Sequence, residues 1–156
     1  AYAARIDMAI QIMPLDDPCS KMSNGAESPM SRISLLDDEK TIKKAIMRAT
    51  TDSEGAIYYD LENKPGISNL LNIYSSFSGM PVEDIVNRYE GRGYGDFKKD
   101  LVEVTVDALR PIRERFQEIR PSQELIHILR DGAEKANAVS EKTMKRVKER
   151  FGLGVE

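Results

Sequence analysis

The chain has no tryptophan, one cysteine and one histidine, and only 6% of its 156 residues are aromatic. The single cysteine, Cys19, excludes an internal disulfide, and the single histidine, His127, has no second histidine with which to bind a metal. No apolar run is long enough to cross a membrane and no signal peptide is recognisable, so we expect a cytoplasmic protein without a membrane partner. The low aromatic content favours helices over a β-sandwich.

Neither sign of charge dominates. The formal net charge is -3 and the sequence pI is about 5.4, so the chain as a whole does not attract nucleic acid. We expect no DNA partner, and any contact with RNA must depend on a local basic face. With 40% hydrophobic and 31% charged residues, the chain is long enough to bury a core without disulfides.

The first thirty-four residues differ in composition from the rest. An apolar run, Met8–Met13, ends at Pro14 and is typical of a short strand or a strand-like tail. From Pro14 to Ser34 the sequence is rich in Pro, Asp, Ser, Asn and Gly, which predicts a long loop. Structureless segments of this length in a compact domain are usually functional, and this one contains Lys21, Met22 and Ser23.

The remainder of the chain carries apolar residues at intervals of three and four, which predicts amphipathic helices. Asp37 or Asp38 is a candidate N-cap for the first of them, and Gly79 is placed to end the second. Pro111 predicts a kink in the longest helix, and Gly132 is a possible break in the last. We therefore predict an all-α helical bundle, with a brief strand at 57–59 and helices over about 38–50, 67–77, 82–89, 97–119 and 122–151.

Lys21-Met22-Ser23 resembles the first three residues of the K-M-S-K-S signature of class I aminoacyl-tRNA synthetases. The resemblance implies that the Lys21 ammonium neutralises the phosphates of ATP, and that the full enzyme binds ATP together with Mg²⁺. It also implies that the Met22 backbone meets the adenine and that Ser23 holds the turn. Asn24 replaces the second lysine of the signature. The catalytic contribution of this loop is therefore expected to be weak.

Longer blocks resemble the tryptophanyl-tRNA synthetases in the same order along the chain. They include I-M-P-L-D-D-P-C-S-K-M-S at 12–23, S-L-L-D-D-E-K-T-I-K-K-A-I at 34–46, K-P-G-I-S-N-L-L at 64–71, L-R-P-I at 109–112 and G-A-E-K-A at 132–136. The resemblance implies two parts. Residues 1–34 would be a remnant of the Rossmann-like catalytic domain with its loop, and residues 35–156 a helical domain that binds the tRNA anticodon.

The same resemblance implies a role in ATP-dependent attachment of tryptophan to tRNA. No H-I-G-H signature is present, so the chain alone is expected to be inactive and to need no cofactor. Its expected partners are tRNA, the catalytic half of the synthetase and a second copy in a homodimer. The alternatives are a non-catalytic or designed helical module and a tyrosine-specific relative. Basic residues on the predicted helices are candidates for RNA contact, above all Arg110, Arg113, Lys142, Lys145 and Arg146.

Overall fold

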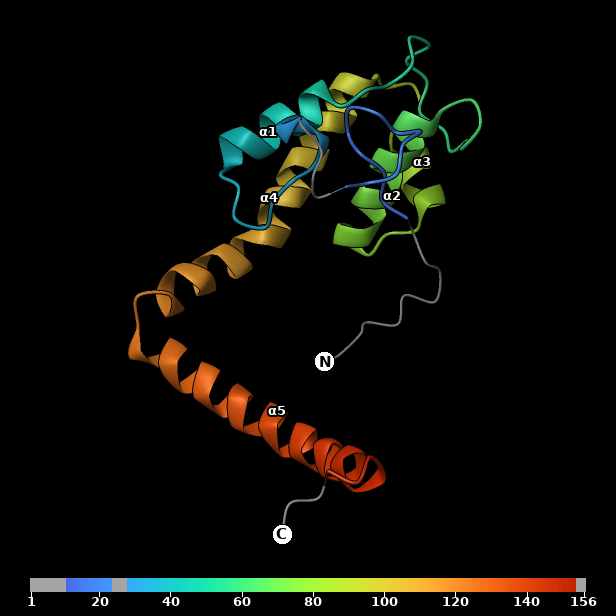
Figure 1. Cartoon of the computed structure of the whole chain (residues 1–156). Coiled ribbons are helices and arrows are strands. Elements are labelled where there is room, and N and C mark those ends of the chain that lie inside the picture. Colours follow the sequence, from blue (N-terminus) through green and yellow to red (C-terminus); the bar gives the residue numbers. More distant parts are fainter. Residues whose placement is uncertain (1–10, 24–27, 154–156) are drawn as a thin grey trace. The chain divides into compact units, whose positions relative to one another are not determined.

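The structure is a computed structural model that describes residues 11–23 and 28–153. Over these residues the chain is all-α, as predicted, and contains no strand. The brief strand predicted at 57–59 is wrong, because this segment pairs with no other strand in the described parts of the chain. The elements, shown in Figure 1, are η1 (Pro29–Ser31), α1 (Glu39–Arg48), α2 (Pro65–Ser78), α3 (Val82–Arg88), α4 (Tyr94–Ile119) and α5 (Gln123–Arg150).

The helix ends follow from local chemistry. The side chain of Asp38 accepts a hydrogen bond from the backbone N–H of Thr41 at 2.8 Å, which satisfies a free donor at the start of α1. Gly79 ends α2 with a φ of 73°, a left-handed conformation that glycine adopts without steric cost. Pro81 immediately precedes α3, where its missing N–H is no loss.

The two long helices are continuous both at Pro111, where the sequence predicts a kink and not a stop, and at Gly132, where it allows a break. Helix α4 passes through Pro111, and α5 passes through Gly132 as one helix of 28 residues. The predicted split at Gly132 is therefore wrong, since a single glycine costs a helix only about 1 kcal/mol. The described part of the predicted N-terminal strand, Gln11–Met13, is irregular, and Met8–Ile10 lie outside the described residues.

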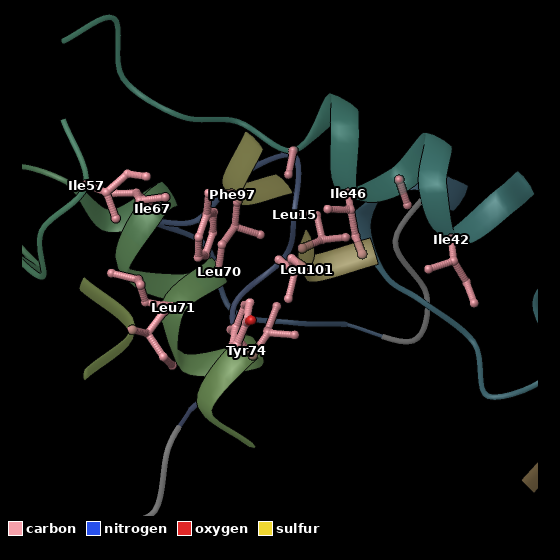
Figure 2. Close-up of a cluster of buried hydrophobic side chains, with 14 of the residues drawn as sticks. Leu15, Ile42, Ile46, Ile57, Ile67, Leu70, Leu71, Tyr74, Phe97 and Leu101 are labelled. Carbon is pink, nitrogen blue, oxygen red and sulfur yellow. The ribbon is translucent and has the colours of Figure 1, made fainter. Parts of the chain in front are cut away.

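The chain forms two compact units, residues 1–113 and 114–156. The first contains the hydrophobic core, with α1, α2 and α3 around the first half of α4 (Figure 1). An aromatic cluster lies at its centre, because Phe97 stacks on Tyr74 at 5.8 Å and meets the edge of Tyr89 at 5.2 Å, centroid to centroid. Leu15, from the predicted loop, belongs to this core (Figure 2).

The second unit consists of the end of α4 and α5, and none of the residues of α5 is buried. Arg115 forms ion pairs with Glu118 and Glu124, and Ser122 donates a hydrogen bond to the carbonyl of Ile119 at the turn between the helices. No helix in the described parts of the chain combines the length and apolar character that a bilayer crossing requires.

Candidate nucleotide loop and basic surface

The loop that contains Lys21 is closed at its base by backbone hydrogen bonds. The N–H of Leu15 donates to the carbonyl of Ser31 at 2.8 Å, which brings the two ends of the loop together. The carbonyl of Leu15 accepts from the N–H of Thr50 at 2.8 Å, and the Thr50 hydroxyl donates to the carbonyl of Asp16 at 2.7 Å. The loop is therefore attached to the segment that follows α1.

The chain entering the loop is also attached to α2. Asn69 is 3% exposed, and its side-chain amide makes two hydrogen bonds to one residue. Its Oδ1 accepts from the N–H of Met13 and its Nδ2 donates to the carbonyl of Met13, each at 2.9 Å. Sequence reasoning did not single out Asn69, although an asparagine among the apolar residues of a helix is itself a signal of such a role.

Within the loop, a short turn precedes the lysine. Asp17 accepts hydrogen bonds from the N–H and hydroxyl of Ser20 and from the N–H of Cys19. Lys21 is exposed. Met22 is half-buried and lines an apolar cavity of about 280 Å³. Lys21 is thus presented to solvent, where a phosphate can reach it. Asn24, the position that departs from the signature, lies outside the described residues.

A second cluster that sequence reasoning missed surrounds Lys64, the N-cap residue of α2. Its side chain is only 2% exposed, and Nζ lies 3.2 Å from Asp52 and 2.9 Å from Glu54. It also donates to the carbonyl of Ala56 at 2.8 Å and to the hydroxyl of Tyr94 at 3.0 Å. Burial opposes the charge, but these hydrogen bonds prevail and hold the pKa of Lys64 above its ordinary value.

Asp52 is the carboxylate at the centre of this cluster. Burial raises its pKa, but hydrogen bonds from the Tyr94 hydroxyl, the Glu54 N–H and Lys64 outweigh burial and hold the pKa below its ordinary value of 3.8. A carboxyl group whose pKa is lower in the folded state stabilises the fold above its unfolded pKa, and this contribution is lost as the pH falls through the folded pKa.

Replacing Asp52 by asparagine is therefore expected to lower the free energy of unfolding by about 1 to 2 kcal/mol at neutral pH, because charge-assisted hydrogen bonds are lost from a partly exposed site. The difference from the original protein should shrink as the pH falls from about 4, near the unfolded pKa, through the lowered pKa of Asp52 in the folded state. Urea unfolding across this pH range measures it. Asp96→Asn, which affects an exposed ion pair with Lys99, is the control and should change stability by less than about 0.5 kcal/mol. A pH-independent difference would contradict the role assigned to the Asp52 carboxylate.

The predicted RNA-contacting residues belong to both units. In the first unit, Arg110 pairs with Asp107 at 2.7 Å. Arg113 donates to the carbonyl of Asp37 at 2.8 Å, so it also holds the segment before α1 against α4. In the second unit, three of the predicted residues are exposed on α5: Lys142, Lys145 and Arg146. Arg146 donates a hydrogen bond of 3.5 Å to the hydroxyl of Thr143.

Helix α1 has the most one-sided charge. Ile42, Ala45, Ile46 and Ala49 are buried against the core, and the one acidic residue of the helix, Glu39, lies 3.8 Å from Arg113. The exposed face carries four cations, for which no ion pair occurs among the described residues: Lys40, Lys43, Lys44 and Arg48. We call these four residues the α1 ridge.

Other candidate chemistry is absent from the described residues. Cys19 is exposed and has no disulfide partner. No group of histidine, cysteine or acidic residues among residues 11–23 and 28–153 is arranged to hold a metal ion. The candidate site is therefore an exposed lysine in a loop whose base is hydrogen-bonded to the helical body.

A model of the family described as "tRNA synthetases class I (W and Y)" matches residues 2–110. The chain belongs to this family. Within it, the chain is homologous to part of tryptophan–tRNA ligases. It is 54% identical over 143 residues to the Tryptophan–tRNA ligase of Bacillus anthracis, which covers 92% of this chain and 44% of that protein. It is 51% identical over 144 residues to the ligase of Halalkalibacterium halodurans, with the same coverage.

Solved structures give the same result. The tryptophanyl-tRNA synthetase of Mycoplasma pneumoniae matches with a TM-score of 0.78 at 31% identity, over 92% of this chain and 44% of that one. The synthetase of Campylobacter jejuni complexed with ADP and tryptophan matches with a TM-score of 0.66, again at 31% identity and with the same coverage. The chain therefore spans less than half the length of the relatives that it matches.

Proposed function

We propose that this chain is the part of a tryptophan–tRNA ligase that carries the ATP-binding loop and a helical tRNA-binding region. The observation that carries the proposal is the 54% identity with a tryptophan ligase over 92% of the chain. In the whole protein, ATP with Mg²⁺ would drive attachment of tryptophan to its tRNA. A related structure complexed with ADP and tryptophan supports these ligands. The relatives that this chain matches are tryptophan–tRNA ligases, which supports tryptophan and not tyrosine as the amino acid.

Lys21 is the residue proposed to meet the phosphates of ATP, with Met22 and Ser23 beside the nucleotide. The exposed position of Lys21 supports this role. The isolated chain is expected to lack catalysis, because it has no H-I-G-H signature and Asn24 replaces the second lysine. The remaining, catalytic part of the synthetase is therefore a necessary partner.

A chimera tests the proposal directly. The corresponding part of the Bacillus anthracis ligase would be replaced by this chain, and tryptophan-dependent exchange of pyrophosphate into ATP would be measured. We expect exchange with tryptophan by the chimera and none by the isolated chain. A folded chimera that is inactive, or that responds to tyrosine, would refute the proposal.

Restoring the second lysine is expected to accelerate that reaction. A donor aimed at charge that develops in a transition state is worth about 2.7 to 4 kcal/mol, so Asn24→Lys in the chimera should raise the exchange rate roughly a hundredfold to a thousandfold. Asn24→Gln is the control, because it lengthens the side chain without a charge. Equal rates for the two variants would show that the ammonium is not what the loop lacks.

For tRNA, the proposed contacts are Lys142, Lys145 and Arg146 on α5, Arg110 and Arg113 on α4, and the α1 ridge. Cations that are not already paired are the better candidates, since a paired guanidinium must give up its acid before it binds a phosphate. This argument places the α1 ridge and the α5 residues ahead of Arg110 and Arg113, which pair with Asp107 and Glu39. A homodimer and a cytoplasmic location remain predictions.

A second candidate is a non-catalytic helical module that kept the family's core and lost its ligand loop. Asn24 and Gly25 favour it, because they replace the second lysine and the final serine of the signature. Glu27, two residues further on, adds a negative charge to a segment that would have to bind phosphate. This candidate predicts no exchange of pyrophosphate into ATP by the chimera and no preference for tryptophan tRNA, so the exchange assay and a titration with tRNA distinguish the two.

A further inference from the structure

Lys98 of α4 is a buried lysine without a carboxylate partner among the described residues. It is 7% exposed. Its Nζ donates to the carbonyl of Ala49 at 2.8 Å and to the hydroxyl of Thr51 at 3.2 Å. Burial lowers the pKa of Lys98, and a buried cation without an opposing charge costs stability. An apolar side chain of similar length would fill the same space without that cost.

The two acceptors of Lys98 lie on either side of Thr50, the residue that holds the base of the nucleotide loop. The N–H of Thr50 donates to the carbonyl of Leu15, and its hydroxyl donates to the carbonyl of Asp16. The third polar group of Thr50 is its carbonyl, which lies 2.2 Å from the position that a Cβ on Gly66 would occupy. The backbone of Thr50 is therefore confined by α2 while its donors face the loop.

An ammonium suits this position because it has three donors and can bind two neighbouring acceptors at once. By binding the backbone carbonyl of Ala49 and the side-chain hydroxyl of Thr51, it restrains the chain on both sides of Thr50. An apolar replacement would leave the core filled but would release that segment. A lysine therefore occupies this buried position because it orients Thr50, and not because the core needs its volume.

We infer that Lys98 is a positioning residue for the nucleotide loop, which it orients through Thr50 without touching the nucleotide. The inference rests on the proposed function only in naming this loop as the one that meets ATP. The anchoring itself is a property of the isolated chain. It connects a lysine on α4 to the loop that presents Lys21, across three segments that are far apart in the sequence.

Hydrogen exchange of single amides tests the anchoring in the full chain, without nucleotide. In Lys98→Met, we expect the amide of Thr50 to exchange at least about tenfold faster, because the bond to Leu15 opens locally. Amides in the middle of α2, such as that of Leu71, should keep their exchange rates. Lys99→Met is the control, since Lys99 is exposed on the same helix and, among the described residues, pairs only with Asp96.

A milder pair of variants covers the case in which Lys98→Met fails to fold. Thr51→Val removes the hydroxyl that accepts a hydrogen bond from Lys98, and should speed exchange at Thr50, whereas Thr51→Ser should restore slow exchange. In the chimera, Lys98→Met should raise KM for ATP and leave KM for tryptophan unchanged. Unchanged exchange at Thr50, or an equal increase at Thr50 and Leu71, would overturn the inference. An inactive chimera would count against the proposed function alone.

Discussion

Gly66→Ala is expected to destabilise the first unit by at least about 2 kcal/mol, since forcing a methyl group into a filled space costs more when only backbone surrounds it. A Cβ at Gly66 would lie 2.2 Å from the carbonyl oxygen of Thr50 and 3.2 Å from the Cα of Thr51. Neither atom can move alone, because Thr50 is bonded to Leu15 and Asp16. The substitution should therefore also loosen the base of the nucleotide loop.

The measurement is urea unfolding followed by far-ultraviolet circular dichroism. Gly95→Ala is a matched control, because Gly95 is the second residue of α4 as Gly66 is the second residue of α2, and nothing lies within 4 Å of its added Cβ. Alanine there should be neutral or stabilise by up to about 1 kcal/mol. Similar stabilities for the two variants would contradict the close approach of α2 to the segment after α1.

Neutralising three of the four cations of the α1 ridge is expected to lower the affinity of the isolated chain for tRNA by on the order of a hundredfold at low salt. The variant carries Lys40→Gln, Lys44→Gln and Arg48→Gln, which lie one turn apart on the exposed face of α1. Each phosphate contact that is lost should reduce the slope of log affinity against log salt by roughly 0.9. Stability should change little, because none of the three residues is buried.

The control variant removes the same charge from cations that are already paired. Lys99, Arg115 and Lys135 are exposed and form ion pairs with Asp96, with Glu118 and Glu124, and with Asp131 respectively. Their replacement by glutamine alters the net charge equally, so it controls for long-range attraction. An equal loss of affinity in both variants would mean that net charge, and not the α1 ridge, determines binding.

The helices could be predicted from sequence because each is a local pattern. Asp38 has the side chain and position of an N-cap, and Gly79 has the left-handed conformation that its place after α2 requires. The K-M-S loop was likewise visible as three residues in an unstructured segment. In each case neighbours along the chain contain the necessary information.

The contacts that attach the loop containing Lys21 to the helices were not predicted, because they join residues that are far apart in sequence. Asn69 binds Met13, 56 residues away, and Lys98 binds Ala49, 49 residues away. No local pattern marks Lys64 as buried, yet it lies buried among acids and tyrosines. Buried lysines are rare, so composition favours the wrong assignment until the fold brings the partners together.

The central claim, that this chain is a tRNA-binding part of a tryptophan–tRNA ligase, is tested most directly by filter binding of the isolated chain to tRNA. Tryptophan tRNA and a non-cognate tRNA would be titrated at a low and a physiological salt concentration. We predict binding that weakens steeply with salt, with tighter binding of tryptophan tRNA at both concentrations. Equal binding of the two tRNAs, or no binding at low salt, would contradict the claim.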